Sequence, residues 1–275
     1  MRRLSYISGA GSAEVCLDCR SALAGTAEGI RGREWGYSIG YRSIAGATRA
    51  ARECSLSVTF FDLAVADELR RLADRDMRES TPGTLAVDGW SQRAYIAQAE
   101  PSAISRSHVS MKLTVVLLDG VWRRGHTLSF ERSATAEGGD DLDLPYDLPY
   151  DLAAPSPRSR FEAGEWGETP LRLVFYGPVI DPSVRIGGNL YRVDVVVPEG
   201  GRLVVDPLAS PRSVTLVNAD GSTVDAFSKA RRGGGLGGGE YIFQPAPPGA
   251  NEVGWDRSFG FDLTWYEEEG EPPWS

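Results

Sequence analysis

Residues 169–275 contain eight short runs of β-branched and aromatic residues, which are punctuated by glycine and proline. The runs are LRLVFYG, VRIGG, YRVDVVV, RLVVD, SVTLVN, TVDAF, EYIFQ and FDLTWYE, and the breaks between them include GPVIDP, PEGG, NADG and PAPPGAN. Short strands at this spacing are typical of an antiparallel β-sandwich rather than of βαβ units. The glycine-rich stretch RRGGGLGGGE (231–240) cannot carry a packed core, so we expect a mobile loop there.

The N-terminal part, residues 1–135, is expected to consist mainly of strands. Within SLSVTFFDL (55–63), apolar side chains alternate so that Leu56, Val58 and Phe60 share one face of a strand. A second long strand is predicted for SHVSMKLTVVLLDG, residues 107–120. Together with the helix described next, these strands indicate a mainly β, α+β fold.

One amphipathic helix is predicted over residues 65–77, with Asp62 as its N-cap. Its apolar side is expected to carry Val65, Leu69, Leu72 and Met77. Thr81-Pro82-Gly83 should end the helical segment. Beyond it, TLAVDGW and QRAYIAQA predict a hairpin that turns at Asp88-Gly89.

Residues 136–168 differ from both flanking parts, because they are acidic and rich in proline and lack a core-forming period. The segment DLPYDLPYDL repeats the unit Asp-Leu-Pro-Tyr, and each proline disfavours helix at the leucine before it. We therefore predict a linker in extended or polyproline geometry. Its Tyr146 and Tyr150 are expected to dock on a surface and to order the linker in an assembled particle, while a loose acidic connector is the alternative.

Charge is unevenly distributed along the chain, whose net charge is −9. Residues 1–130 carry 17 basic and 14 acidic side chains, a net of +3, and residues 131–275 carry 12 and 24, a net of −12. Neither half is the strongly basic domain that a nucleic-acid binder usually has. No apolar run approaches the length of about 20 residues that a membrane helix needs. The N-terminus also lacks the apolar stretch of a signal peptide, so no membrane association is expected.

Motifs for catalysis, cofactors and metals are missing from the sequence. GGGLGGG lacks the GK[ST] ending of a phosphate-binding loop, and neither GxSxG nor HExxH occurs. Cys16, Cys19 and Cys54 include one CxxC pair, which we interpret as reduced, half-buried thiols rather than as a zinc or redox site. His108 and His126 have no neighbouring nucleophile or carboxylate pattern. We expect no catalytic residue, no cofactor and no metal.

Two alternatives from other functional classes remain open at the level of sequence. Trp255, Trp265 and Tyr266 are able to stack on sugar rings, which would make the chain a carbohydrate-binding adhesin module, although the alternating run FDLTWYE favours core packing for Trp265. A β-sandwich with paired carboxylates would also be compatible with a glycan-cleaving enzyme.

The order of several local segments resembles the distal tail protein (Dit) family of siphovirus-type bacteriophages. Residues 52–100 are similar to the family's N-terminal domain, in which a strand leads to a helix, a PG-L-V strand and a Trp-containing turn. DLPYDLPYDL is similar to a proline-tyrosine segment between the family's two domains. YGPVIDPSVRIGG, GRLVVDP, VTLVNADG and PPGANEV follow the order of its galectin-like sandwich. RRGGGLGGGE departs from the family by being longer and richer in glycine.

The resemblance implies a structural role in the virion, at the tail tip, for a protein made in the host cytoplasm. It predicts a tail-tube-like ring-forming domain in residues 1–135, the linker in residues 136–168 and a galectin-like β-sandwich in residues 169–275. The implied partners are further copies in a ring, usually a hexamer, the tail tube protein, a tail-associated hub protein and receptor-binding proteins. DNA would pass through the lumen as cargo only. The near-balanced charge of the N-terminal part also favours that part, rather than the acidic half, as the ring-forming domain.

Overall fold

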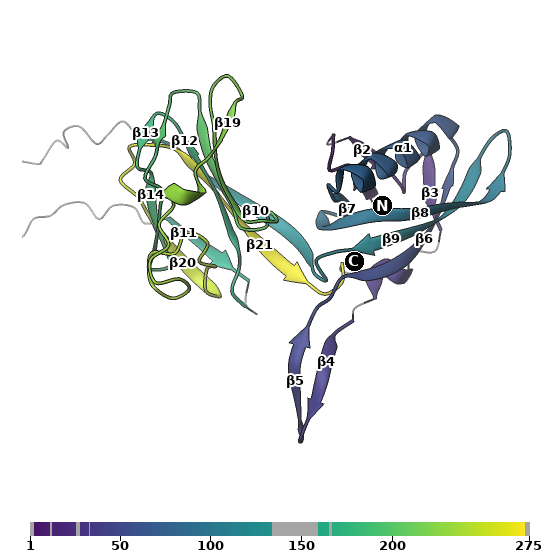
Figure 1. The fold of residues 1–275 in the computed structure, drawn as a ribbon, viewed down its shortest axis with the longest axis horizontal. Coiled ribbons are helices and arrows are strands. Elements are labelled where there is room, and N and C mark those ends of the chain that lie inside the picture. Colours follow the sequence, from purple (N-terminus) through teal and green to yellow (C-terminus); the bar gives the residue numbers. More distant parts are fainter. Residues whose placement is uncertain are drawn as a thin grey trace, which may run out of the picture. The chain divides into compact units, whose positions relative to one another are not determined.

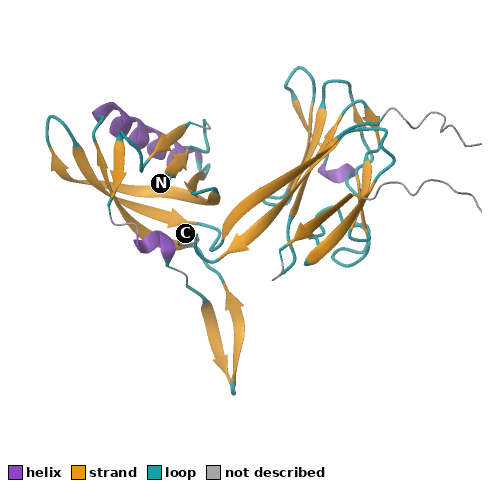
Figure 2. Ribbon diagram, turned by 180° about the vertical axis from the view of Figure 1, so that it is seen from behind, coloured by secondary structure: helices purple, strands orange, loops and turns teal. Residues whose placement is uncertain are grey.

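The computed structural model describes residues 3–11, 13–25, 28–32, 34–133, 159–164 and 167–272. It contains two compact units, one formed by residues 1–124 with 268–275 and the other by residues 125–267 (Figures 1 and 2). These bounds differ from the expected ones because the C-terminal segment returns to unit 1. In addition, residues 159–163, inside the expected linker, form a strand of unit 2.

Unit 1 is built on one antiparallel sheet with the strand order β2-β1-β7-β8-β9-β6-β3. The strands are β1 (Leu4–Ile7), β2 (Glu14–Cys16), β3 (Ala22–Ala24), β6 (Arg52–Phe60), β7 (Gly83–Val87), β8 (Trp90–Ile104) and β9 (Val109–Leu117). Only residues 17–21 separate β2 from β3, the two edge strands of this sheet, so the sheet must curl until its edges approach each other. The first residues of β10 (Trp122–Phe130) pair with β8 at Arg123 and Ser91. A short 3₁₀ helix, η1 (Glu28–Arg31), and an antiparallel hairpin of β4 (Gly36–Gly40) and β5 (Ser43–Thr48) lie between β3 and β6.

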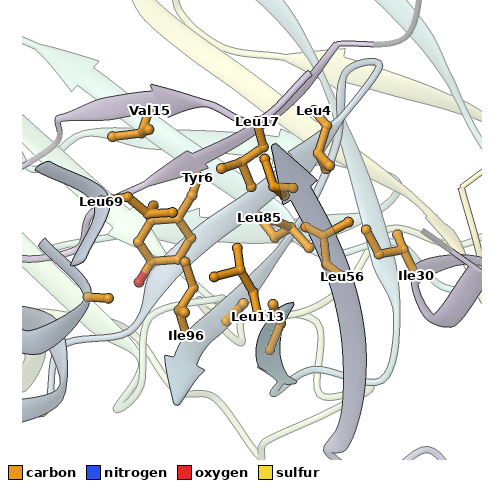
Figure 3. Packing of buried hydrophobic residues seen from close by; sticks show 14 of the residues in the cluster. Leu4, Tyr6, Val15, Leu17, Ile30, Leu56, Leu69, Leu85, Ile96 and Leu113 are labelled. Atoms are coloured by element: carbon orange, nitrogen blue, oxygen red, sulfur yellow. The ribbon is translucent and has the colours of Figure 1, made fainter. Parts of the chain in front are cut away.

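The alternation predicted for residues 55–63 is confirmed by β6, in which every second side chain enters the core of unit 1. Cys54, Leu56, Val58 and Phe60 are buried, and the residues between them are not. Figure 3 shows how Leu56 packs among side chains from β1, β2, β7, β8, β9 and the helix. The period of two therefore places one face of β6 in the core.

The predicted helix is α1 (Leu63–Glu79), and it lies against one face of the sheet (Figure 1). The predicted N-cap is confirmed, because the Asp62 carboxylate accepts a hydrogen bond from the Ala64 N–H at 2.9 Å. Ser80 adopts a left-handed conformation directly after the last turn. The prediction for Met77 is wrong: its side chain is exposed, because the buried stripe continues through Ala73 to the polar Asp76 instead.

The hairpin predicted at Asp88-Gly89 joins β7 to β8. Both turn residues have positive φ, 49° at Asp88 and 86° at Gly89, as a type I′ turn requires. β8 then pairs with β9 over most of its length, with two irregularities in register. The predicted long strand at residues 107–120 is confirmed as β9, which begins at Val109 and ends at Leu117.

Unit 2 has two antiparallel sheets around one core, as the sequence predicted. One sheet has the order β10-β21-β12-β17-β18-β19, the other has the order β11-β20-β14-β15, and β13 pairs with β16 separately. The strands are β11 (Ser159–Ala163), β12 (Leu171–Tyr176), β13 (Val179–Ile180), β14 (Ser183–Ile186), β15 (Asn189–Arg192), β16 (Val196–Val197), β17 (Arg202–Asp206), β18 (Ser213–Val217), β19 (Thr223–Asp225), β20 (Gly249–Gly254) and β21 (Phe261–Glu269). Buried side chains from both sheets form a single cluster. The mainly β fold is therefore confirmed, with one α-helix among the described residues.

Two segments of unit 2 differ from their sequence-based assignments. The sequence predicts a strand for EYIFQ, but this segment is irregular, with a turn at Ile242 and Phe243 in which both side chains are buried. Adjacent buried side chains do not fit a strand with one solvated face. The sequence predicts a break at PAPPGAN (245–251), but its last residues begin β20 (Gly249–Gly254), which pairs with β11 and β14.

Candidate assembly surface

The hairpin of β4 and β5 extends away from the sheet of unit 1 (Figure 1). Apart from Gly40, every residue of these two strands is exposed, and among the described strands they pair with each other alone. Tyr41 and Arg42 connect them, and Arg42 has a φ of 60°. Gly46, with a φ of 64°, lies where β5 carries one extra residue relative to β4.

The two faces of this hairpin differ in chemical character. Ile39 pairs with Ile44, so both side chains lie on one face, and strand alternation adds Tyr37 to it. Ile39 is 82% exposed and Ile44 is 68% exposed. The opposite face carries small residues, since Ser38 pairs with Ala45. The face that carries Tyr37, Ile39 and Ile44 is therefore unusually apolar for a surface exposed to water.

An isolated two-stranded hairpin is at best marginally stable in water. This hairpin adds to that weakness, because its large apolar side chains have no core to enter and Arg42 is its single charged residue. Exposed apolar surface of this kind commonly marks a contact with another protein. The alternation of Trp35, Tyr37, Ile39 and Tyr41 was visible in the sequence, but alternation alone does not reveal that neither face is buried within the chain.

Asp76 is the most deeply buried carboxylate described, at 0% exposure, and it acts as an acceptor that joins α1 to β1. It accepts hydrogen bonds from the Tyr6 hydroxyl at 2.8 Å, the Ser8 hydroxyl at 2.7 Å and the Ala10 N–H at 3.1 Å. Burial, reinforced by the hydrogen bond to Asp76, raises the pKa of Tyr6 above its ordinary value. With three donors already bound, this carboxylate is suited to hold the fold together rather than to transfer protons.

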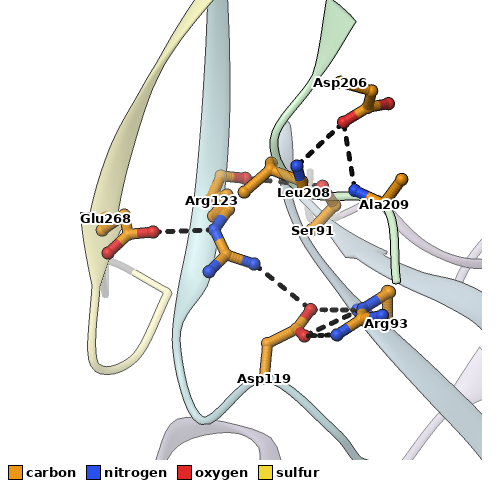
Figure 4. A network of polar contacts seen from close by, with 8 residues as sticks. All are labelled: Ser91, Arg93, Asp119, Arg123, Asp206, Leu208, Ala209 and Glu268. Carbon is orange, nitrogen blue, oxygen red and sulfur yellow. Dashed lines mark hydrogen bonds and ion pairs between the residues drawn. The ribbon is translucent and has the colours of Figure 1, made fainter. Parts of the chain in front are cut away.

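A second carboxylate, Asp119, is held by two arginines in unit 1 (Figure 4). Arg93 donates to it from Nε at 2.9 Å and from its backbone N–H at 3.1 Å, and Arg123 lies 3.3 Å away. Arg123 also donates to Glu268 at 2.7 Å, which connects the end of β21 to the network. The hydrogen bond to Asp119 raises the pKa of Arg93. Asp206, in unit 2, similarly accepts two backbone N–H groups, from Leu208 and Ala209.

The two histidines lie in different units and have different neighbours. His108 shares a hydrogen bond of 2.9 Å with the Ser105 hydroxyl. His126 stacks on Trp265 at a centroid distance of 5.4 Å and lies 3.2 Å from Glu267. This last contact lacks the geometry of a hydrogen bond, because the His126 Nε2 atom has no hydrogen-bond partner. His108 thus has a hydroxyl beside its ring, but among the described residues no hydrogen bond or ion pair joins that ring to the carboxylate that a triad also needs.

Trp255 and Trp265, which the sequence offered for sugar binding, are half-buried and pack on other rings of unit 2. Trp255 contacts Phe130 edge-on at 5.1 Å and donates from Nε1 to the Phe259 carbonyl at 3.2 Å. Trp265 lies 5.0 Å from Phe161. The core packing that the alternating pattern favoured for Trp265 is thus observed, and these two rings offer only part of their surface to a sugar.

An open depression of about 660 Å³ lies in unit 2 beside the start of the glycine-rich stretch. Its lining includes Lys229, Arg231 and Arg232, together with Asp194 and Glu240. Asp194 pairs with Arg231 at 2.9 Å and with Arg192 at 2.7 Å, and its hydrogen bond from Arg192 lowers its pKa. Among the charged lining residues, Asp194 and Arg231 are thus engaged in ion pairs.

The remaining predictions concern the linker tyrosines, metal ligands and membrane helices. Tyr146 and Tyr150, the predicted interface residues, lie outside the described residues. In the part of the chain that the structure describes, no three His, Cys, Asp or Glu side chains gather as metal ligands. Within the same ranges, no helix has the length and apolar character needed to cross a bilayer.

No protein-family model matches the sequence, and no curated protein sequence matches it. A search of solved structures, in contrast, finds whole-chain similarity. A chain in the structure of the phage p2 baseplate in its activated conformation matches with a TM-score of 0.63 and 9% sequence identity. The match covers 99% of this chain and 100% of that one. The chain is therefore a two-unit, mainly β protein that shares the fold of this phage p2 baseplate chain.

The crystal structure of the phage SPP1 Dit protein, described as a hub of the adsorption apparatus, also matches at 9% identity over 98% of this chain. Its TM-score is 0.47.

Proposed function

We propose that this chain is a structural protein of a bacteriophage tail tip, related to the distal tail proteins that join the tail tube to the host-recognition apparatus. The observation that carries the proposal is the fold similarity to the p2 baseplate chain, which extends over both units and nearly the full length. The sequence resemblance, which rests on the order of local segments, points to the same class independently of that similarity.

Within this role, unit 1 forms a closed ring, with six copies as the expected number. A ring closed by rotation uses a heterologous contact, in which one surface of each copy binds a different surface of the next. The apolar face of the β4–β5 hairpin, with Tyr37, Ile39 and Ile44, supplies one of these two surfaces. Burying it would remove the large apolar side chains from water and support a hairpin that is weak alone.

Unit 2, with its galectin-like sandwich, then projects from the ring and is available to receptor-binding proteins. The acidic balance of the C-terminal half favours this arrangement, because like charges repel when they are crowded around an axis. The tail tube protein and a tail-associated hub protein are the proposed partners of the ring.

The location is tested by labelling virions of the phage that carries this sequence with antibodies against the purified full chain. Gold particles at the distal end of the tail, in electron micrographs, are the expected result. Gold particles on the capsid would contradict the proposal. Gold particles on host cell debris, with none on the virions, would also contradict it.

We also propose that the chain has no hydrolytic activity on host glycans. The buried carboxylates Asp76 and Asp119 are engaged with donors, whereas a general acid needs a carboxyl group free to exchange its proton with the substrate. Incubation of the full chain with host cell-wall polysaccharide should release no reducing ends above background. Release that disappears in a variant of one Asp or Glu would instead establish an enzyme, whereas binding without turnover would add an adhesin role to unit 2.

A further inference from the structure

The CxxC pair lies in the short connection between the two edge strands of the unit 1 sheet. Cys16 is the last residue of β2, and Cys19 belongs to the turn that leads into β3. Backbone hydrogen bonds fix this turn at both ends, from the Leu17 N–H to the Leu4 carbonyl at 2.8 Å and from the Cys19 N–H to the Ala22 carbonyl at 2.6 Å. The two thiols are therefore carried by a defined turn.

The two thiols are three positions apart in the sequence of this turn, and their surroundings differ. The Cys19 side chain is exposed and shares a hydrogen bond of 3.2 Å with the Ser21 hydroxyl. Cys16 is only partly exposed. The Cys19 thiol is thus open to a reagent from solution, and the Cys16 thiol at the start of the same turn is less accessible.

The two thiols also differ in their pKa values. Burial raises the pKa of Cys16 to about 11, with help from its hydrogen bond to Cys19. Burial also acts to raise the pKa of Cys19, but hydrogen bonds from Cys16, the Ser21 hydroxyl and backbone N–H groups outweigh it and lower that pKa below its ordinary value. Cys19 therefore holds the larger share of thiolate, which is the nucleophilic form.

Cys54 provides an internal reference for a thiol without these features. It is buried on the core face of β6, and burial raises its pKa. A buried thiol in apolar surroundings is unreactive.

We propose that Cys16 and Cys19 form a thiol–disulfide exchange site, which reacts with a low-molecular-weight disulfide such as oxidised glutathione and closes to an intramolecular disulfide. In the first step the Cys19 thiolate attacks one sulfur of glutathione disulfide; a bond forms between Cys19 Sγ and that sulfur, and one glutathione thiolate leaves. In the second step Cys16 gives up its proton, its sulfur attacks Cys19 Sγ, and the second glutathione leaves as thiolate. The pair of protein thiols is oxidised and the glutathione disulfide is reduced to two thiols.

The disulfide would close only a short loop, so its effect on global stability is small. Its effect is local: it covalently fixes the turn between the two edges of the sheet. The reaction is a stoichiometric modification and adds no catalytic activity to the chain.

The test uses the reduced full chain, incubated with glutathione disulfide and analysed by intact mass and peptide mapping. The wild type should lose two hydrogen atoms and gain a peptide crosslinked between Cys16 and Cys19. Cys16→Ser should stop at the first step, with one glutathione retained on Cys19. Cys19→Ser should remain largely unmodified, and Cys54→Ser should react like the wild type.

Reaction rates provide the second readout, and they do not depend on disulfide closure. With a small disulfide reagent, Cys19 should react at least about tenfold faster than Cys54 in the folded chain. Equal rates at these two positions would overturn the proposal, as would a glutathione adduct of Cys16→Ser that forms on Cys54.

Discussion

At the scale of single residues, the buried carboxylates act as hydrogen-bond acceptors, and Asp76 gives the sharpest test. Asp76→Ala leaves three donors, from Tyr6, Ser8 and Ala10, without their acceptor in a fully buried place. We expect a loss of about 2–4 kcal/mol in the free energy of unfolding, measured by urea denaturation. Asp74→Ala, on the exposed side of the same helix, should change it by no more than about 0.5 kcal/mol. Equal losses in the two variants would show that the Asp76 contacts do not support the fold.

The raised pKa of Tyr6 predicts how the free energy of unfolding depends on pH in the alkaline range. Its pKa is raised in the folded chain, above the value of about 10 expected when unfolded. A raised pKa means that its stabilising contribution is complete below about pH 10 and is lost as the pH rises further. The free energy of unfolding should therefore fall more between pH 8 and pH 11 in the wild type than in Tyr6→Phe. The buried Tyr191, whose pKa burial also raises, is present in both proteins and cancels in the comparison. Parallel declines would contradict the assignment.

At the scale of elements, the β4–β5 hairpin is the part of unit 1 whose apolar side chains lack a core. Replacing both Ile39 and Ile44 with Asp places charge on the face proposed to bind the neighbouring copy. Assembly should be lost, as measured by mass in solution, while the monomer stays within about 0.5 kcal/mol of wild-type stability because both side chains are exposed. Ile180→Asp, at a 73% exposed position in unit 2, is the matched control and should leave assembly intact. Unchanged assembly of the hairpin variant would exclude this face from the contact.

Elements with a regular apolar period were predictable from the sequence, and those that depend on distant partners were not. The strand at Leu56, Val58 and Phe60, the cap at Asp62 and the turn at Asp88 follow from local rules. Met77 was misplaced, because the helical stripe continues into a buried carboxylate whose partners lie on β1. The strands β11 and β20 pair with each other although they are far apart in the sequence of unit 2. No local pattern reveals such a pair.

The candidate assembly surface was also only partly predictable from the sequence. Alternating apolar residues from Trp35 to Tyr41 predict a strand, but a strand normally buries one of its faces. That both faces of β4 are exposed depends on the absence of any third element over them in the described chain, which is a tertiary property. The CxxC pair was visible in the sequence and was interpreted as half-buried reduced thiols, whereas the exposure of Cys19 and its hydrogen bond with Ser21 are seen only in the folded turn.

At the scale of the whole molecule, the architecture was better predicted than its boundaries. The order of local segments implied a strand-and-helix unit followed by a sandwich, and the shared fold with the p2 baseplate chain extends over both. The return of residues 268–275 to unit 1 was not foreseen, because it depends on contacts between residues far apart in the sequence, such as Glu268 with Arg123. A truncated chain of residues 1–135 would lack this segment, so assembly is better tested in the full chain.

The central claim is that copies of this chain close into a ring through unit 1, and the most direct measurement is the mass of the purified full chain in solution, combined with negative-stain images of the same sample. We predict a discrete assembly with the mass of six chains and ring-shaped particles with a central opening. A monomer at all accessible concentrations, or open aggregates without a closed ring, would contradict the account.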